Sequence, residues 1–150
     1  MSLQIYYKNR SLKKISESIV FFVDDKFSFK PLKKHIFRDE YTYISDLLNT
    51  SDLKKSIISF DINSKRKIIL ISIKKNIQSS EIEALGARFF NYFKEIKKIS
   101  LNINTDTIPN SPKKFIGYFL HGLKLKSYNF NKYKSKKEKR NILINVFGKN

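Results

Sequence analysis

The sequence predicts an α/β domain in which a mixed β-sheet lies between helices. Strand and helix patterns alternate along the chain, and one strand pattern is apolar throughout. The 150 residues contain only 4 glycines and 3 prolines, and no Gly/Ser-rich or Pro-rich stretch divides them. We therefore expect a single domain over residues 1–150, with one continuous sheet.

Six segments have the composition of strands: residues 3–7, 18–24, 56–61, 67–73, 99–103 and 141–147. Residues 19–23 are all apolar, which is typical of a strand buried on both faces. The third and fourth segments are separated by a polar stretch of hairpin length, residues 62–66. The strand after that turn, rich in isoleucine, is expected to be central in the sheet.

Three segments have the periodicity of helices. The first, residues 39–49, is short. The second, residues 80–96, starts with Ser80 and Glu83 at capping-box spacing and has an apolar face. The third starts with Ser111 as N-cap and Pro112 as the first helical residue, and its apolar positions are Phe115, Ile116, Phe119, Leu120 and Leu123. The order ββα, ββα, βα, β predicts helices on both sheet faces and parallel pairs joined by right-handed crossovers.

The net charge favours polyanions as non-specific partners, because 31 Lys and Arg outnumber 13 Asp and Glu to give +18. The absence of cysteine excludes disulfides, thiolate metal sites and cysteine nucleophiles. No apolar stretch approaches the roughly 20 residues of a membrane span. Because the first residues also lack the pattern of a signal peptide, we expect a cytoplasmic protein that does not contact the membrane.

Residues capable of acid–base or metal chemistry are scattered. His35 and His121 are far apart in the sequence, and neither has a second ligand at the spacing of a helical metal site. The acidic pairs fall at a strand end or at helix starts, where capping is their expected role: Asp24 and Asp25, Asp39 and Glu40, Glu81 and Glu83. The sequence therefore predicts no catalytic residue and no metal ligand in this chain.

The four glycines are dispersed, and none opens a helix directly after a strand: Gly86, Gly117, Gly122 and Gly148. A nucleotide-binding loop needs glycine-rich backbone whose N–H groups approach the phosphates. This pattern argues against a dinucleotide or ADP-ribose pocket, and no cofactor is expected.

The most informative segment comprises residues 115–140, in which aromatic and basic residues alternate. The aromatic residues are Tyr128, Phe130 and Tyr133. The basic residues are Lys124, Lys126, Lys132, Lys134, Lys136, Lys137, Lys139 and Arg140. In one interpretation the lysines contact phosphates while the aromatics stack on nucleic-acid bases. In the other, the aromatics pack beneath the end of the third helix and the lysines belong to a solvated loop.

The same segment resembles the end of the N-terminal domain of the cytosolic leucyl aminopeptidases, the M17 metallopeptidases. In that family a helix ending in Glu-Gly-Leu leads into a Tyr-x-Phe-x-x-Tyr-Lys segment, a strand and then the catalytic domain. The matching positions here are Gly122, Leu123, Tyr128, Phe130, Tyr133 and Lys134. His121 stands where the family usually has an acidic residue.

The resemblance implies a macro-like three-layer domain without catalytic residues. Family catalysis takes place in a C-terminal domain, absent from this chain, that removes N-terminal residues from peptides with two divalent metals, Zn or Mn. Its Asn-Thr-Asp-Ala-Glu-Gly-Arg signature is matched here only by Asn104, Thr105 and Asp106. We therefore carry no catalytic role onto them.

The resemblance implies that this domain supports assembly of the parent enzyme and shapes access to its active site. The partners would be the catalytic domain of the same protein and further copies in a hexamer. The alternative is nucleic-acid binding through residues 124–140, a role that some bacterial members of the family take on. A third hypothesis, ADP-ribose or nucleotide binding, rests on macro-like fold analogy alone.

Overall fold

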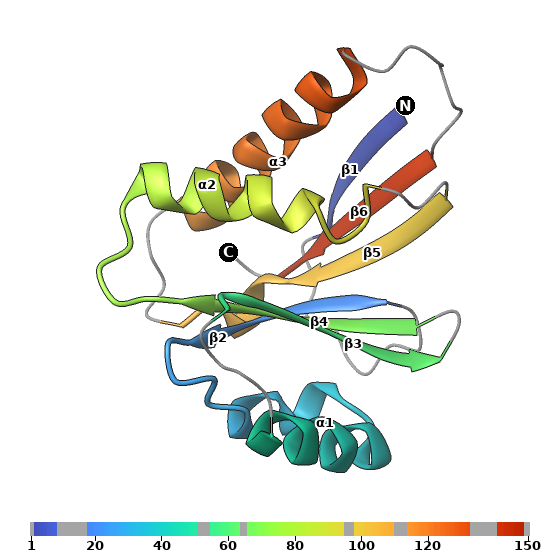
Figure 1. The fold of residues 1–150 in the computed structure, drawn as a ribbon, viewed down its shortest axis with the longest axis vertical. Helices are drawn as coiled ribbons and strands as arrows, with labels where there is room; N and C mark the ends of the chain where they lie inside the picture. Colours follow the sequence, from blue (N-terminus) through green and yellow to red (C-terminus); the bar gives the residue numbers. More distant parts are fainter. Residues whose placement is uncertain are drawn as a thin grey trace.

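The computed structural model describes residues 2–8, 18–50, 55–63, 66–94, 98–109, 114–132 and 141–148. These residues form one six-stranded sheet in the order β1-β6-β5-β2-β4-β3 (Figure 1). The neighbouring strands are parallel except for β3, which is antiparallel to β4. The strands are β1 (Ser2–Lys8), β2 (Ile19–Asp24), β3 (Ile57–Asn63), β4 (Arg66–Ile73), β5 (Lys98–Asn104) and β6 (Asn141–Phe147). The mixed sheet and its six strands confirm the predicted α/β class.

Helices cover both faces of this sheet, as predicted. Figure 1 shows α2 (Ser79–Phe90) and α3 (Phe115–Lys132) on one face and α1 (Arg38–Thr50) on the other. Strand β2 lies between β5 and β4, and its first five residues are buried. Its uniformly apolar sequence is explained by this position, since both of its faces pack against a core.

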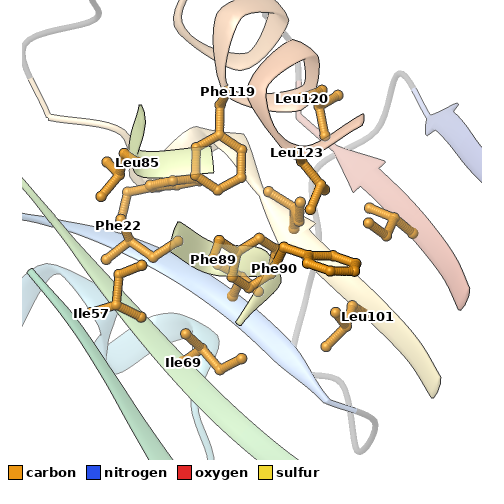
Figure 2. Packing of buried hydrophobic residues seen from close by; sticks show 14 of the residues in the cluster. Phe22, Ile57, Ile69, Leu85, Phe89, Phe90, Leu101, Phe119, Leu120 and Leu123 are labelled. Atoms are coloured by element: carbon orange, nitrogen blue, oxygen red, sulfur yellow. The ribbon is translucent and has the colours of Figure 1, made fainter. Parts of the chain in front are cut away.

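The larger core lies between the sheet and helices α2 and α3. Figure 2 shows Phe22 of β2 among Leu85 and Phe89 of α2 and Phe119 of α3. The rings of Phe22 and Phe119 meet edge to face, with centroids 5.6 Å apart. These aromatic contacts join the two helices to the centre of the sheet.

The smaller core lies on the opposite face, beneath α1, where Ile44 and Leu48 pack over apolar residues of β2 and β4. A buried ion pair accompanies it. The Nε and Nη2 atoms of Arg66 donate to the two carboxylate oxygens of Glu40, at 2.7 and 2.8 Å. The Arg66 side chain is only 4% exposed, so this bidentate pair joins the start of β4 to the first turn of α1.

Three helix boundaries differ from the sequence prediction by more than one residue. The N-cap of α2 is Gln78, whose backbone N–H donates to the Glu81 carboxylate at 3.1 Å, so Ser80 and Glu83 are not the capping pair. The same helix ends at Phe90, and Phe93 is buried in the turn that follows it rather than on a continuing helix. The apolar periodicity extended past the helix because this turn also faces the core.

The third difference concerns α3, which continues to Lys132. The resemblance predicts that Tyr128 follows the end of this helix, but Tyr128 lies within it. No Pro or Gly follows Gly122 before residue 132, and Lys and Leu favour helix, so nothing in this sequence ends it earlier. The predicted cap residues Ser111 and Pro112 lie outside the described residues.

Two short 3₁₀ helices were not predicted: η1 (Lys30–His35) and η2 (Thr105–Thr107). The second follows β5, in a segment where the sequence predicts neither a strand nor a helix. No helix in the described parts of the chain is long and apolar enough to cross a bilayer.

Candidate functional site

The segment that resembles the aminopeptidases begins where α3 crosses α2, and glycine makes that crossing possible. A Cβ atom on Gly122 would lie 1.9 Å from the carbonyl oxygen of Glu83, and one on Gly86 would lie 2.0 Å from that of Phe119. Each helix thus places a glycine against the backbone of the other. Leu123, the next residue of the motif, is fully buried. The Gly-Leu pair therefore fixes the packing of the two helices.

The next motif residue, Tyr128, lies on the solvent-facing side of α3. Tyr128 is 66% exposed and Leu125 49% exposed, although both are large apolar side chains. Lys124, four residues before Tyr128, shares its side of the helix. His121, one turn earlier, is exposed, and its Nδ1 lies 3.1 Å from Glu83 Oε1. We call His121, Lys124, Leu125 and Tyr128 the outer face of α3.

The candidate contact residues do not all gather on this outer face. Lys126 is exposed but projects from a different side of α3, because two residues correspond to a rotation of about 200°. Phe130 and Lys132 belong to α3 by their backbone. The remaining candidates lie outside the described residues: Tyr133, Lys134, Lys136, Lys137, Lys139 and Arg140. Tyr128 does not pack beneath the helix end.

A second polar cluster, not predicted, lies at the carboxyl ends of β5, β2 and β6. Ligands bind at such strand ends in open α/β sheets. Here the Thr107 hydroxyl accepts the Phe22 N–H at 2.9 Å and donates to the Asn104 carbonyl at 2.8 Å. The Thr105 hydroxyl donates to the Phe147 carbonyl at 2.7 Å. These hydroxyl groups connect three adjacent strand ends.

The side chains around Asn104 complete this cluster. Asn104 is fully buried, and its Oδ1 accepts the Asp106 N–H at 3.0 Å while its Nδ2 lies 3.3 Å from His35 Nδ1. Gly148 has φ +144°, and a Cβ there would lie 1.7 Å from the Thr105 hydroxyl. The triplet Asn104, Thr105 and Asp106 that partly matched the catalytic signature therefore has a structural role, and His35 is a buried side chain beside Asn104. Only the spacing of short polar residues after a strand could have indicated this cluster.

Two carboxylates, those of Asp24 and Glu81, interact with residues close to them in the sequence. Burial raises the pKa of Asp24, but hydrogen bonds from Ser28 and Lys26 outweigh this, so the pKa lies below its ordinary value of 3.8. The Lys74 ammonium and the Gln78 N–H lower the pKa of Glu81. Asp24 accepts the backbone N–H groups of Lys26 and Ser28, at 3.1 and 2.9 Å, and so shapes the turn after β2. Within the described ranges no three His, Asp or Glu side chains converge as metal ligands would.

The fold has known relatives among solved structures. No protein-family model and no curated protein sequence matches the chain. A leucine aminopeptidase mutant from tomato superposes with a TM-score of 0.66 at 13% identity, over 99% of this chain and 33% of the other. The macrodomain of Thermus aquaticus DarG superposes with a TM-score of 0.54 at 13% identity, over 97% of this chain and 99% of the other. The chain therefore has a macro-like α/β fold and spans about a third of the aminopeptidase.

Proposed function

We propose that this chain is a non-catalytic N-terminal domain of the leucyl aminopeptidase type, which supports assembly and shapes access to a separate catalytic domain. The observation that carries the proposal is the superposition of 99% of this chain on 33% of a leucine aminopeptidase, with a TM-score of 0.66. The Gly122-Leu123 pair of the motif supports it, because this pair forms the close contact between α2 and α3. Tyr128 departs from the motif, since it lies within α3 and not after its end.

The cluster at the carboxyl end of the sheet is occupied by hydrogen bonds among its own members. In the proposed parent enzyme the two divalent metals, Zn or Mn, are held by the catalytic domain and supply the peptide hydrolysis. The residues of this chain would position that domain and its copies, in a hexamer.

The test uses the full product of the source gene, with and without residues 1–150. We expect the intact product to hydrolyse leucine p-nitroanilide in the presence of Mn or Zn and to form an oligomer by light scattering. Deletion of residues 1–150 should lower the number of subunits in the oligomer or raise the KM for peptide substrates. An intact product without aminopeptidase activity would contradict the proposal.

Nucleic-acid binding is the second candidate, and the exposed pair of Lys124 and Tyr128 favours it. A ring that is 66% exposed beside a lysine offers a stacking surface next to a phosphate contact. In a salt titration, log K should fall against log salt with a slope of about −0.9 per phosphate contact on duplex DNA. A flat slope, or unchanged binding after Lys124, Lys134, Lys136 and Lys137 are replaced by Glu, would exclude it.

A further inference from the structure

A surface cavity opens where the end of α2 meets the start of the edge strand β3, away from the outer face of α3. It has a volume of about 420 Å³ and is lined by Lys55, Ser56, Ile57, Arg88, Asn91 and Tyr92. Ligand pockets for small molecules usually have about 300–1,000 Å³. The cavity is therefore large enough for one small organic molecule.

Two elements form the walls of this cavity. Arg88, Asn91 and Tyr92 have helical spacing at the end of α2 and the turn after it, so they point to one side. The Tyr92 hydroxyl donates to the Ile57 carbonyl at 2.9 Å, which ties this wall to β3. The preceding Ser56 carbonyl accepts the Ser72 N–H at 2.7 Å and is held to β4. The lining is thus fixed to the sheet on both sides.

The charge of the lining is positive. Lys55 and Arg88 are both exposed, and neither is paired with a carboxylate within the part of the chain that the structure describes. The Ser56 hydroxyl and the Asn91 amide add neutral donors. The Tyr92 ring, which is partly buried, supplies an apolar surface beside these groups.

We propose that this cavity binds a small phosphorylated molecule. The Arg88 guanidinium is suited to bidentate contact with phosphate oxygens, and Lys55 adds a second positive charge. The organic part of the ligand lies against the Tyr92 ring. This site is independent of the proposed aminopeptidase role.

The test is an NMR titration of the chain with phenyl phosphate at constant ionic strength. We expect saturable shifts confined to residues 55–57 and 88–92, and weaker saturation by inorganic phosphate, which lacks the ring. Arg88→Gln should weaken phenyl phosphate binding about tenfold, the loss of one charged hydrogen-bonding partner. Lys55→Gln should weaken it by a smaller factor.

Lys34→Gln is the matched control, because Lys34 is also an exposed lysine but lies in η1, outside the cavity. It removes the same charge as Lys55→Gln and should leave the affinity within about twofold, as expected of screened surface charges. Shifts spread over the surface lysines, or equal effects of Arg88→Gln and Lys34→Gln, would overturn the proposal. Benzoate binding as tight as phenyl phosphate would overturn the assignment to phosphate.

Discussion

Gly122 is the residue at which the sequence motif and the packing of the fold coincide. In the sequence it precedes the Tyr128 motif, and a glycine near the end of an apolar helical pattern usually indicates a helix end. In the structure it lies in the middle of α3, because the backbone of α2 leaves no space for a side chain. The sequence could predict the helix but not this reason for glycine, since the contact joins residues far apart in the chain.

The close helix crossing predicts unequal effects of two Gly→Ala substitutions in α3. Gly122→Ala should destabilise the chain by about 1–3 kcal/mol, because the added methyl group overlaps the Glu83 carbonyl. Gly117→Ala should instead stabilise it by up to about 1 kcal/mol, because nothing lies within 4 Å and alanine favours helix. Urea unfolding measures both free energies. Equal effects would show that α2 and α3 are not in contact at Gly122.

The lowered pKa of Asp24 predicts that the contribution of this residue to the free energy of unfolding depends on pH. Its pKa is lower in the folded state, so its contribution is present above the unfolded value of 3.8 and is lost as the pH falls through the folded value. Asp24→Ala should cost about 1 kcal/mol at neutral pH, and the difference from the original chain should narrow as the pH falls from about 5 to about 2. Urea unfolding at several pH values measures this. Asp25→Ala, at the exposed neighbour, serves as control, and a difference that widens in acid would contradict the account.

At the scale of elements, the order of strands and helices could be predicted because the spacing of apolar residues in the sequence indicates which face of each element is buried. β2 and β4 were evident from their continuous apolar runs, and both lie in the interior of the sheet. The 3₁₀ helices could not be predicted, since η2 depends on hydrogen bonds to β2 and β6 that are distant in sequence. The extension of α3 was missed because the exposed Leu125 and Tyr128 break the apolar pattern.

The ion pair that attaches α1 to the sheet predicts that substitution of Arg66 lowers the stability of the chain much more than substitution of its neighbour Lys67. Arg66→Met should destabilise the chain by about 3 kcal/mol, because it leaves the Glu40 carboxylate, 14% exposed, without its bidentate partner. Lys67→Met should change stability by less than about 1 kcal/mol, because the Lys67–Asp61 pair is far more exposed. Thermal unfolding followed by circular dichroism compares the two. Equal losses would show that the buried pair does not hold α1.

At the scale of the whole molecule, the sequence predicted the fold more completely than the arrangement of the candidate contact residues. The mixed α/β sheet follows from the element order, whereas its macro-like form was implied by the resemblance and is supported by two solved folds at 13% identity. The candidate contact residues could not be placed together from the sequence, because Lys124 and Lys126 prove to project from different sides of α3. The net charge of +18 attracts anions generally and does not by itself identify a partner.

The most direct test of the central claim is to read the source gene beyond the Asn150 codon. The account predicts that the reading frame continues into a second domain with the Asn-Thr-Asp-Ala-Glu-Gly-Arg signature. A stop codon directly after Asn150 would contradict it, and the basic residues 124–140 would then become the leading candidates for the function of the chain.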